Sequence, residues 1–360
     1  MRRVSLDMTR PGMVLAKTIL GGTGQALLQA GIEIKPQYIT YLKRLGINYI
    51  YIQDKRIEDV EINDLISEET RHEARIIVKN TMKSFQTPGT QKKGFNVQDK
   101  QLIKTVSKII NEVMNSREVI VQLVDIRAKD DYLFAHSVNC SILTTLVAIK
   151  MGYKSKSLKA LATGTLLHDL GMIHVPENIL NKPGDLTEDE YKTVKNHAFY
   201  GYELFKKTSL FSALAGDIIV QHHERIQGQG YPQGLKGDKI NPLAQIISIV
   251  DVYDALTSER PYRNAYLPHQ AVEMLFSWGG EAFDMTILTV FLSMIAAYPL
   301  GFQVLLSNGE SGLVIGNNPG CSLRPIVRVL YSGEDLAPHP KPYDLDLAKN
   351  LNLTIISVLS

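Results

Sequence analysis

The sequence predicts a mainly α-helical protein: a helical bundle with a small α/β unit before it and a small β-rich unit after it. Three observations lead to this prediction. Long segments of helical character dominate residues 55–296, a glycine-rich turn separates two short apolar runs near the start, and an Asn-Gly pair joins two apolar runs near the end. Because the chain has 360 residues, we expect two or three domains rather than one.

The N-terminal α/β unit is assigned to residues 1–54. The segment VLAKTIL, the turn GGTG and the segment ALLQAG predict a β-hairpin. PQYITYLKRLG predicts a short amphipathic helix that ends at Gly46. INYIYI predicts a strand that closes the unit.

Residues 55–118 are predicted to form a helical connector. Its two charged helices, over residues 61–83 and 97–115, are separated by TPGTQKKG, which has the composition of an exposed loop. Lysines make this stretch locally basic, and a solvated helix face explains them better than an anion-binding role does. Both helices carry enough apolar residues to pair with a second copy of the chain or with a signalling partner, and equally to pack within the chain.

The helical bundle is assigned to residues 119–296. Thr187 and Glu190 have the spacing of a capping box at the start of one of its helices. Pro299 interrupts the uncharged stretch over residues 285–307, so we expect a buried helix followed by a strand, with no insertion into a membrane. The expected helices cover residues 131–152, 157–171, 187–207, 210–224 and 241–258.

The last segment, residues 297–360, is predicted to form a small β unit. FQVLLS and SGLVIG lie on either side of Asn308-Gly309, and an Asn-Gly pair between apolar runs is a strong hairpin signal. RPIVRVLY and LTIISVL predict further strands.

Charge and cysteine content exclude several classes of protein. The 39 Lys and Arg against 37 Asp and Glu give a net charge of +2, so no overall basic field draws the chain to a nucleic-acid polymer. The only two cysteines, Cys140 and Cys321, cannot form a disulfide framework or a closely spaced zinc site. Charged residues and a proline interrupt any export signal at the N-terminus. We therefore expect a cytoplasmic protein.

Histidines and aspartates in the helical region form the candidate chemical site. Asp169 directly follows His168, and Asp251 lies among apolar residues in IISIVDVYDAL, where an unpaired carboxylate is costly. Each feature alone is more often structural than functional. Together, imidazoles and carboxylates are ligands of Zn, Fe and Mn, and seven such groups exceed what one catalytic ion uses. We therefore predict two divalent ions, with the ligands His136, His168, Asp169, His197, His222, His223 and Asp251.

The segments that follow these residues have features suited to phosphates and bases. HHERIQGQGYPQGLKG contains several glycines and a proline, which predict a tight loop with an exposed backbone. Arg260 and Arg263 in SERPYR carry guanidinium groups that suit phosphate oxygens, and Tyr231 and Tyr262 offer ring faces for a purine. Asp254, on the helix before SERPYR, is assigned to substrate binding, although a solvent-side position would also explain it.

At this point the chain resembles the HD-GYP domain, a subgroup of the HD phosphohydrolase superfamily. The resemblance covers about residues 120–290 and is carried by HDLGMIHVPENILNKPGDLT, the histidine of KNHAFYG, HHERIQGQGYPQGLKG and DVYDALTSERPYR. It implies an HD-type helical bundle and hydrolysis of the bacterial second messenger cyclic di-GMP, to linear pGpG or onward to GMP. In the implied reaction, a hydroxide that bridges two metal ions attacks phosphorus.

The resemblance also implies a role for each matching residue. His168 and Asp169 would be catalytic, and iron or manganese would be the metal, with zinc as an alternative. Tyr132 stands where some members place a glutamate for a third ion, so two ions are expected. One ion would be held by His136, His168, Asp169 and Asp251, and the other by Asp169, His197, His222 and His223. The substrate would contact Gly230, Tyr231 and Pro232 of the GYP signature, together with Asp254, Arg260 and Arg263.

One position departs from the family pattern. Met172 stands where the motif usually has a lysine that is proposed to assist catalysis. A thioether can neither donate a proton nor carry a charge, and general acid assistance typically contributes about 10²–10⁴-fold. His174 could partly substitute for the lysine, or be a loop histidine without a role. The alternative function is therefore an impaired module that senses the dinucleotide or acts as an interaction scaffold.

Overall fold

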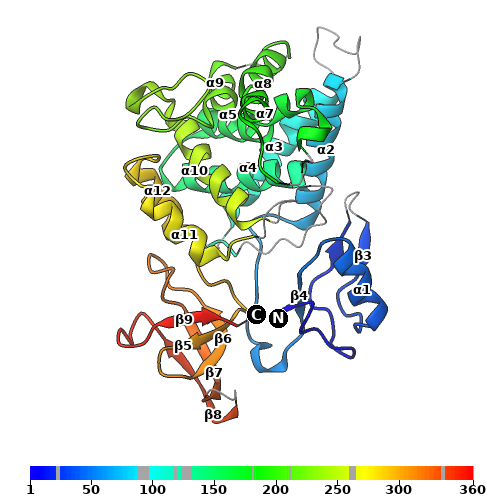
Figure 1. Ribbon diagram of the computed structural model, residues 1–360, viewed down its shortest axis with the longest axis vertical. Helices are drawn as coiled ribbons and strands as arrows, with labels where there is room; N and C mark the ends of the chain where they lie inside the picture. The colour runs from blue at the N-terminus through cyan, green and yellow to red at the C-terminus, as the bar shows by residue number, and fades with distance from the viewer. Residues whose placement is uncertain are drawn as a thin grey trace. The chain divides into compact units, whose positions relative to one another are not determined.

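The computed structural model confirms a mainly α-helical chain with two strand-containing parts (Figure 1). Its described residues fall into two compact units. Unit 1 contains Met1–Asp64, Glu118–Asp131 and Leu292–Ser360, and unit 2 contains Leu65–Arg117 and Tyr132–Phe291. The finer division predicted at residues 54, 118 and 296 stays a prediction. The structure describes residues 1–21, 25–86, 97–116, 120–122, 132–180, 182, 184–208, 210, 212–258, 265–333 and 337–359.

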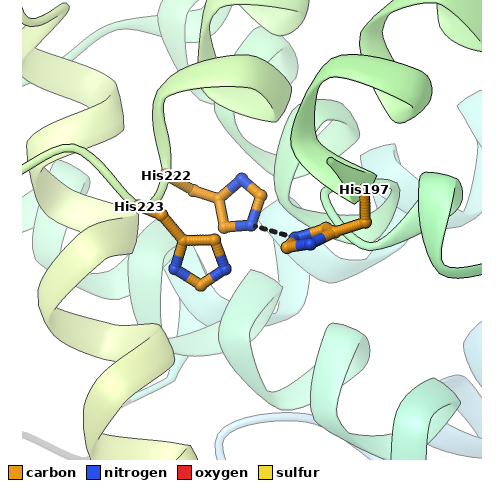
Figure 2. A group of neighbouring side chains, drawn as sticks. All are labelled: His197, His222 and His223. Carbon is orange, nitrogen blue, oxygen red and sulfur yellow. Dashed lines mark hydrogen bonds between the residues drawn. The ribbon is translucent and has the colours of Figure 1, made fainter. Parts of the chain in front are cut away.

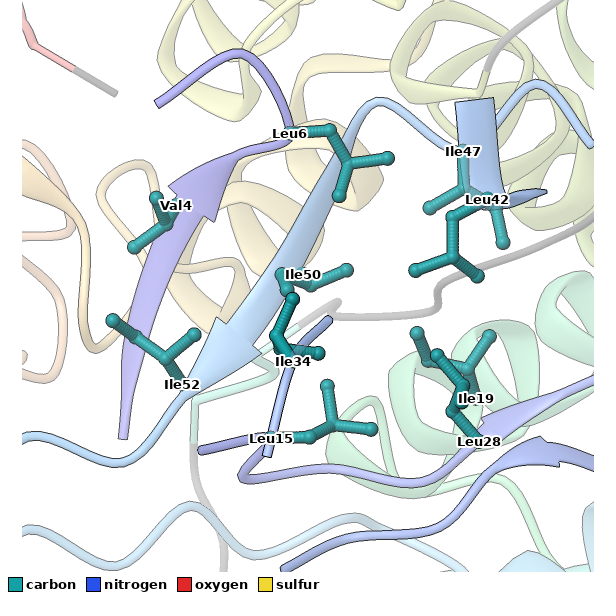
Figure 3. Close-up of a cluster of buried hydrophobic side chains, with 10 residues drawn as sticks. All are labelled: Val4, Leu6, Leu15, Ile19, Leu28, Ile34, Leu42, Ile47, Ile50 and Ile52. Atoms are coloured by element: carbon teal, nitrogen blue, oxygen red, sulfur yellow. The ribbon is translucent and has the colours of Figure 1, made fainter. Parts of the chain in front are cut away.

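The N-terminal part of unit 1 has the paired strands of the predicted hairpin, the helix and the closing strand, and residues 22–24 of the predicted turn lie outside the described residues. The strands β2 (Ile19–Leu20) and β3 (Ala26–Leu28) pair antiparallel. The helix α1 (Pro36–Arg44) is followed by Gly46, which adopts a φ of +74°. Figure 3 shows the buried aliphatic cluster that these elements share, with the members Val4, Leu6, Leu15, Ile19, Leu28, Ile34, Leu42, Ile47, Ile50 and Ile52.

The closing strand β4 (Tyr49–Ile52) pairs antiparallel with β1 (Arg2–Ser5), a partner that the sequence analysis did not predict. Because β1 contains two arginines, it lacks the apolar run of a typical strand. A short 3₁₀ helix, η1 (Lys55–Ile57), follows β4.

The C-terminal part of unit 1 is an antiparallel sheet with the strand order β8-β7-β6-β5-β9. The predicted Asn308-Gly309 hairpin connects β5 to β6, and Gly309 has a φ of +81°. The strand β8 was not predicted because it contains prolines, which cannot donate to the hydrogen-bonded ladder and are tolerated at a sheet edge. The strands are β5 (Gln303–Leu306), β6 (Ser311–Gly316), β7 (Ile326–Ser332), β8 (Ala337–Asp346) and β9 (Ile355–Val358).

Unit 2 is the helical bundle, and helix α4 lies at its core. Helices α2, α3, α5 and α10 all pack against α4, so the two connector helices pack within the chain. By length and composition the segment Leu133–Lys150 of α4 could cross a membrane, but 72% of it is buried inside the structure, as in the core helix of a bundle. The first helices of the unit are α2 (Glu68–Gln86), α3 (Val97–Asn115), α4 (Tyr132–Lys150) and α5 (Ser155–Leu166).

The remaining helices follow the predicted order, with one difference. The helix expected over residues 187–207 breaks at Asn196 into α7 (Glu188–Lys195) and α8 (His197–Phe205). The imidazole Nδ1 of His197 lies 2.7 Å from the carbonyl oxygen of Val194, which a continuous helix would pair with the amide of residue 198. The predicted capping box is present, since Thr187 accepts from the Glu190 amide and the Glu190 side chain accepts from the Thr187 amide.

The segment after α5 turns through the 3₁₀ helix η3 (Leu170–His174), and the end of the bundle includes α11, which the sequence analysis missed. The stretch over residues 285–307 is a helix followed by a strand, as predicted, because α12 ends at Met294 and β5 begins at Gln303. The other elements are α6 (Glu177–Leu180), α9 (Ala213–Gln221), η4 (Gly237–Lys239), α10 (Pro242–Thr257), α11 (Pro268–Ser277) and α12 (Met285–Met294).

Candidate metal centre

The seven predicted ligands, which come from five separate segments, converge in the middle of unit 2. They lie on α4, at the turn after α5, at the start of α8, at the end of α9 and on α10. All except the half-buried His223 are nearly inaccessible to solvent, with exposures of 7% or less. Helix α4 contributes His136, the turn after α5 His168 and Asp169, α8 His197, the end of α9 His222 and His223, and α10 Asp251.

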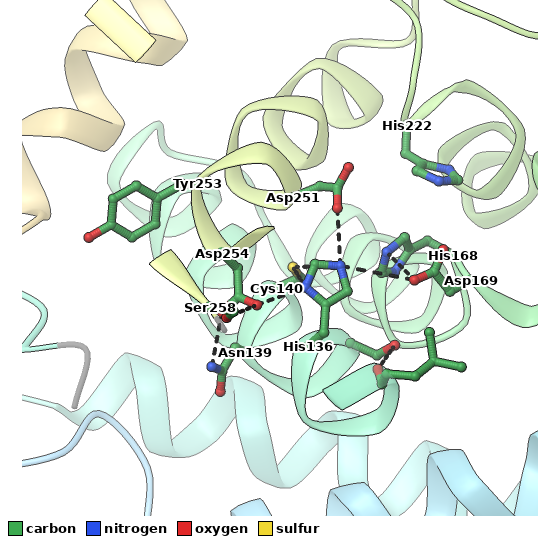
Figure 4. A network of polar contacts seen from close by, with 12 residues as sticks. His136, Asn139, Cys140, His168, Asp169, His222, Asp251, Tyr253, Asp254 and Ser258 are labelled. Atoms are coloured by element: carbon green, nitrogen blue, oxygen red, sulfur yellow. Dashed lines mark hydrogen bonds and ion pairs between the residues drawn. The ribbon is translucent and has the colours of Figure 1, made fainter. Parts of the chain in front are cut away.

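One group of ligand atoms forms around His136 and His168 (Figure 4). The Nε2 atom of His136 is 3.0 Å from Oδ1 of Asp251 and 4.0 Å from Oδ2 of Asp169. The Nε2 atom of His168 is 3.4 Å from the same Asp169 oxygen. Two imidazoles and two carboxylates therefore present their ligand atoms to one small volume.

A second group contains three imidazoles, shown in Figure 2. The Nε2 atoms of His197 and His222 are 3.1 Å apart. The His223 ring lies 4.1 Å from the His222 ring and 5.1 Å from the His197 ring, measured between centroids. A nitrogen atom of each ring lies within 4.8 Å of the others, which is close enough for one ion to bind all three.

Two carboxylates link the groups. Asp169 directs Oδ2 toward His136 and His168, and its Oδ1 lies 3.5 Å from Nε2 of His197. Asp251 directs Oδ1 toward His136, and its Oδ2 lies 3.6 Å from Nδ1 of His223. Because each carboxylate has one oxygen in either group, the seven residues form a single site with two halves.

Hydrogen bonds to the backbone set the orientation of three of the rings. Nδ1 of His168, His197 and His222 lies 2.7 Å from the carbonyl oxygens of Thr165, Val194 and Ile219, respectively. A carbonyl can only accept, so we assign the ring proton to Nδ1 and a free lone pair to Nε2 in each case. This is the second contact that metal-bound histidines typically make.

The donor set fits a cation. Nε2 of His168 is buried and has no hydrogen-bond partner among the described residues. Nε2 of His197 and of His222 carry facing lone pairs at 3.1 Å, an arrangement that is repulsive without a cation or proton near both. Burial, reinforced by the neighbouring imidazoles, lowers the pKa of His222 to about 3, which leaves that ring neutral. A divalent metal ion satisfies all of these atoms together.

The two bridging carboxylates are ionised in this environment. Burial alone would raise the pKa of Asp169, but the surrounding imidazoles, with His168 first, outweigh it and lower the pKa below its usual value. The pKa of Asp251 is also lowered, because the hydrogen bond from His136 and the nearby rings overcome the effect of burial. Both residues are therefore in the form that binds metal.

Asp254 occupies a different place from the one that the sequence analysis gave it. Its Oδ2 lies 2.7 Å from Nδ1 of His136, and its Oδ1 accepts a hydrogen bond of 3.1 Å from Asn139. With an exposure of 2%, it is not a solvent-side residue. Its carboxylate is directed at the side of the His136 ring away from Asp251, a position that suits a residue that orients this ring.

The loop with the GYP signature is held by Glu224, a residue that the sequence analysis did not single out. Glu224 is 1% exposed and accepts hydrogen bonds from the amides of Gln233 (2.7 Å) and Leu235 (2.9 Å). Its signal in the sequence was an acidic residue directly after the His doublet. A Cβ atom on Gly230 would lie 2.4 Å from backbone atoms of residues 224 and 225, so only glycine fits there.

Of the signature residues, Tyr231 contacts rings of the candidate metal ligands. Its ring packs on His223 at 4.6 Å and lies nearly perpendicular to the His197 ring at 6.4 Å, between centroids. Lys195 lies over two tyrosine rings at this edge of the site, 4.4 Å from Tyr191 and 5.3 Å from Tyr231. Pro232 is exposed beside Tyr231. Arg260, Tyr262 and Arg263, which were expected to bind substrate, lie outside the described residues, as does TPGTQKKG.

Met172 and His174, the two residues singled out at the unusual HD motif, both lie in η3. Met172 is half-buried, and its amide donates to the Asp169 carbonyl at 2.9 Å. His174 is exposed, and its ring packs on Tyr200 at 5.5 Å. The structure thus places Met172 one turn from the bridging aspartate.

Comparisons with known proteins agree with the fold. A family model described as an HD domain matches residues 123–287, and one described as a KOW domain associated with an HD domain matches residues 303–360. A cyclic di-GMP phosphodiesterase of Pseudomonas aeruginosa is 34% identical over 66% of this chain and 57% of its own length.

Two further relatives match shorter parts of this chain. A cyclic di-GMP phosphodiesterase response regulator of Xanthomonas campestris is 37% identical over 49% of this chain and 47% of its own length. A 3′3′-cGAMP-specific phosphodiesterase of Vibrio cholerae is 36% identical over 46% of this chain and 38% of its own length. The chain therefore spans about half the length of the curated relatives that it matches.

Proposed function

Because the chain is an HD-GYP domain protein, we propose that it is a metal-dependent phosphodiesterase that hydrolyses cyclic di-GMP to pGpG, to GMP or to both. The observation that carries this proposal is the convergence of five imidazoles and two carboxylates from five segments, with Asp169 between the two halves. The names of the relatives support a cyclic dinucleotide as the class of substrate. A cytoplasmic location is part of the same proposal.

The site would hold two divalent ions, with iron or manganese as the expected metals and zinc as an alternative. When bound, such ions supply charge neutralisation at the phosphoryl oxygens and activation of water. Asp169 and Asp251 each offer one oxygen to either half, and the backbone carbonyls hold the imidazole lone pairs inward. We assign His136, His168, Asp169 and Asp251 to one ion and Asp169, His197, His222 and His223 to the other.

The protein would recognise the dinucleotide beside the metal centre. Tyr231, packed on His223, offers a ring face to a guanine base, and Lys195 adds a positive charge next to it. Arg260 and Arg263 stay proposed phosphate contacts, as the family motif implies. Asp254, by contrast, is now assigned to orienting His136.

Met172 favours a second candidate function, that of a dinucleotide sensor or interaction scaffold with little turnover. Met172 closely follows the His168-Asp169 pair in the sequence, and a methionine side chain offers neither a proton nor a charge. All seven proposed ligands are nevertheless present and close together, so we favour hydrolysis. The two candidates differ in turnover and agree in metal and dinucleotide binding.

The decisive experiment measures hydrolysis of cyclic di-GMP and of 3′3′-cGAMP by the full chain, supplied anaerobically with Mn²⁺ or Fe²⁺. We expect hydrolysis of cyclic di-GMP that depends on the metal. Asp169→Asn should lower the rate by more than about 100-fold, because it removes a negative charge between the two ions. Loss of a residue that only hydrogen-bonds a metal ligand already costs about 10–100-fold in activity.

Asp284→Asn is the matched control, since asparagine can keep the hydrogen bonds that Asp284 accepts from the first amides of α12. We expect wild-type activity from this variant. An Asp169→Asn protein that hydrolyses the substrate at the wild-type rate would contradict the proposed site. Hydrolysis of 3′3′-cGAMP alone would contradict the proposed substrate and leave the metal chemistry in place.

A further inference from the structure

A line of buried polar contacts connects helix α2 to the metal centre. The Nη1 atom of Arg71 on α2 donates to Oδ1 of Asn139 on α4 at 2.8 Å. The Nδ2 atom of Asn139 donates to Oδ1 of Asp254 on α10 at 3.1 Å, and Oδ2 of Asp254 lies 2.7 Å from Nδ1 of His136. The exposures of these side chains are 8%, 1%, 2% and 2%, in that order. All of them belong to unit 2, and Figure 4 shows the part of the line from Asn139 to His136.

Arg71 determines the orientation of the side-chain amide of Asn139. A guanidinium group has only donors, so Asn139 must present its oxygen to Arg71. The amide NH₂ group then points at the Asp254 carboxylate, which can accept from it. With the amide turned over, the Asn139 oxygen would face the carboxylate instead, and two buried acceptors would be left opposed.

The asparagine and His136 together fix the carboxylate of Asp254. One oxygen is engaged by the amide of Asn139 and the other by the imidazole, so the carboxylate cannot rotate without losing one of these contacts. The contact at Nδ1 directs the opposite ring atom, Nε2 of His136, toward Asp251 and Asp169. The orientation of a metal-ligand ring therefore depends on a residue three contacts away.

We propose that Arg71 is a positioning residue for the metal ligand His136, acting through Asn139 and Asp254. The inference rests on the proposed metal site. It adds a residue that lies outside residues 123–287, the segment that the HD domain model matches. It also gives the helical connector a role in the chemistry of the bundle, since α2 supplies the charged end of the line.

The test measures the affinity of the metal-free full chain for Mn²⁺, with the metal alone as the probe. Arg71→Met keeps the length of the side chain and removes its donors, and we expect it to weaken Mn²⁺ binding by at least about tenfold. Arg71→Lys keeps a charged donor and should recover most of the affinity. Hydrolysis of cyclic di-GMP should follow the same order at limiting metal.

Glu112→Gln is the matched control on the same helix pair. Glu112 on α3 accepts from Thr70 and from the amide of Ser67, just before α2. Among the residues that the structure describes, these hydrogen bonds do not extend to His136. We expect the variant to bind Mn²⁺ as the wild type does, even if it melts at a lower temperature. An equal loss of affinity in Glu112→Gln would overturn the inference, because a general loosening of α2 would then explain the Arg71 result.

A double-mutant cycle separates positioning from packing. If Arg71 acts through Asn139, Arg71→Met should weaken Mn²⁺ binding in the wild-type background and have little further effect once Asn139→Leu is present. Additive losses, or wild-type affinity in Arg71→Met, would overturn the inference and leave the proposed function standing. A wild-type chain that binds no Mn²⁺, Fe²⁺ or Zn²⁺ would instead contradict the metal site itself and the inference with it.

Discussion

Three of the clustered imidazoles are oriented by the same kind of local hydrogen bond. His168, His197 and His222 each place Nδ1 against the carbonyl of the residue three positions earlier, in the last turn of α5, α7 and α9. Carbonyls in the last turn of a helix lack the amide partner that the next turn would supply. A histidine just after a helix can therefore satisfy the helix end and hold its own Nε2 lone pair in a fixed direction.

The neutral state of His222 and His223 predicts a pH dependence of the metal-free protein. Burial is the main cause that lowers the pKa of His222 to about 3 and also lowers the pKa of His223, whereas both titrate near 6.5 when unfolded. Between these values the unfolded chain binds protons that the folded chain does not. Stability is therefore fully present above pH 6.5 and falls as the pH drops, by at most about 1.4 kcal/mol per pH unit for each such histidine.

Urea unfolding of the metal-free protein, measured by circular dichroism at neutral and at mildly acidic pH, checks this dependence. We expect a lower midpoint at the acidic pH. His339→Gln, which removes a histidine of the C-terminal sheet, should show the same dependence as the wild type. Equal midpoints at both pH values would show that the buried rings take up protons without a cost in stability.

We expect the residue at position 172 to determine whether turnover is weak or full. Met172→Lys restores the side chain that the family motif usually has, next to the Asp169 carbonyl in η3. If the chain is an impaired enzyme, hydrolysis of cyclic di-GMP should rise by about 100-fold with little change in KM, which is within the range of general acid assistance.

Met172→Leu serves as the control for Met172→Lys because it changes the shape of the side chain without adding charge, and we expect no gain from it. The metal content of both variants is measured alongside the rate. A lysine variant that binds the dinucleotide and two ions yet hydrolyses nothing would favour the sensor over the enzyme.

At the scale of elements, close backbone contacts fix the turns that carry the ligands. A Cβ atom on Gly171 in η3 would lie 2.0 Å from the His197 carbonyl oxygen and 2.5 Å from the Gly201 amide nitrogen of α8. Glycine therefore lets the turn that bears His168 and Asp169 contact the helix that bears His197. This contact helps to place the bridging carboxylate between the two halves of the site.

The loop from Glu224 to Leu235 is a second such element, and it yields a prediction. In the wild type, the two carboxylate oxygens of Glu224 accept from the amides of Gln233 and Leu235. Glu224→Gln keeps only one of these oxygens and places an NH₂ group, which cannot accept, opposite the other amide. Because hydrogen bonds to a buried charged group contribute about 1.5–3 kcal/mol each, we expect the amides of Gln233 and Leu235 to exchange at least tenfold faster. Amide hydrogen exchange of the metal-loaded chain measures this directly.

Glu310→Gln is the control for the loop variant, since it changes a carboxylate in unit 1 that accepts hydrogen bonds from Asn308 and Tyr343. It should leave exchange in the loop unchanged. Wild-type protection of Gln233 and Leu235 in Glu224→Gln would mean that the backbone of the loop holds itself without the carboxylate.

At the scale of the whole molecule, the metal centre should stabilise one unit and not the other. All seven proposed ligands belong to unit 2. A ligand that binds only the folded state stabilises it by about 2.7 kcal/mol when present at 100 times its dissociation constant. Removal of metal with a chelator should therefore speed amide exchange in α4, α9 and α10 and leave the strands β6 and β7 unchanged.

Hydrogen exchange with and without chelator, followed by addition of Mn²⁺, measures both units in one sample. Recovery of protection in the three helices on adding the metal is the expected result. Equal changes in both units would contradict a stabilising effect confined to the bundle, and no change in either would contradict a metal centre that supports the fold.

Much of this protein could be predicted from its sequence, because local patterns carried the information. The hairpin at Asn308-Gly309, the capping box at Thr187 and the order of the main helices depend on neighbours within a few residues. The candidate ligands were predicted because histidine and aspartate in apolar helices are costly without a partner. The strand β8 was missed because it depends on pairing at the edge of a sheet. The break at Asn196 was missed because it depends on the contact of the His197 side chain with the carbonyl of Val194.

Only the tertiary structure decided how the polar residues divide their roles. Asp251 and Asp254 lie three positions apart on α10 and look alike in the sequence, yet one directs its oxygens at ligand nitrogens in both halves of the site and the other supports the back of His136. The roles of Arg71 and Glu224 could not be predicted from the sequence, because their hydrogen-bond partners are set by the packing of α2 on α4 and by the fold of a loop. Residue type fixes which atoms can donate, accept or bind metal, whereas the packing of distant segments fixes which of them meet.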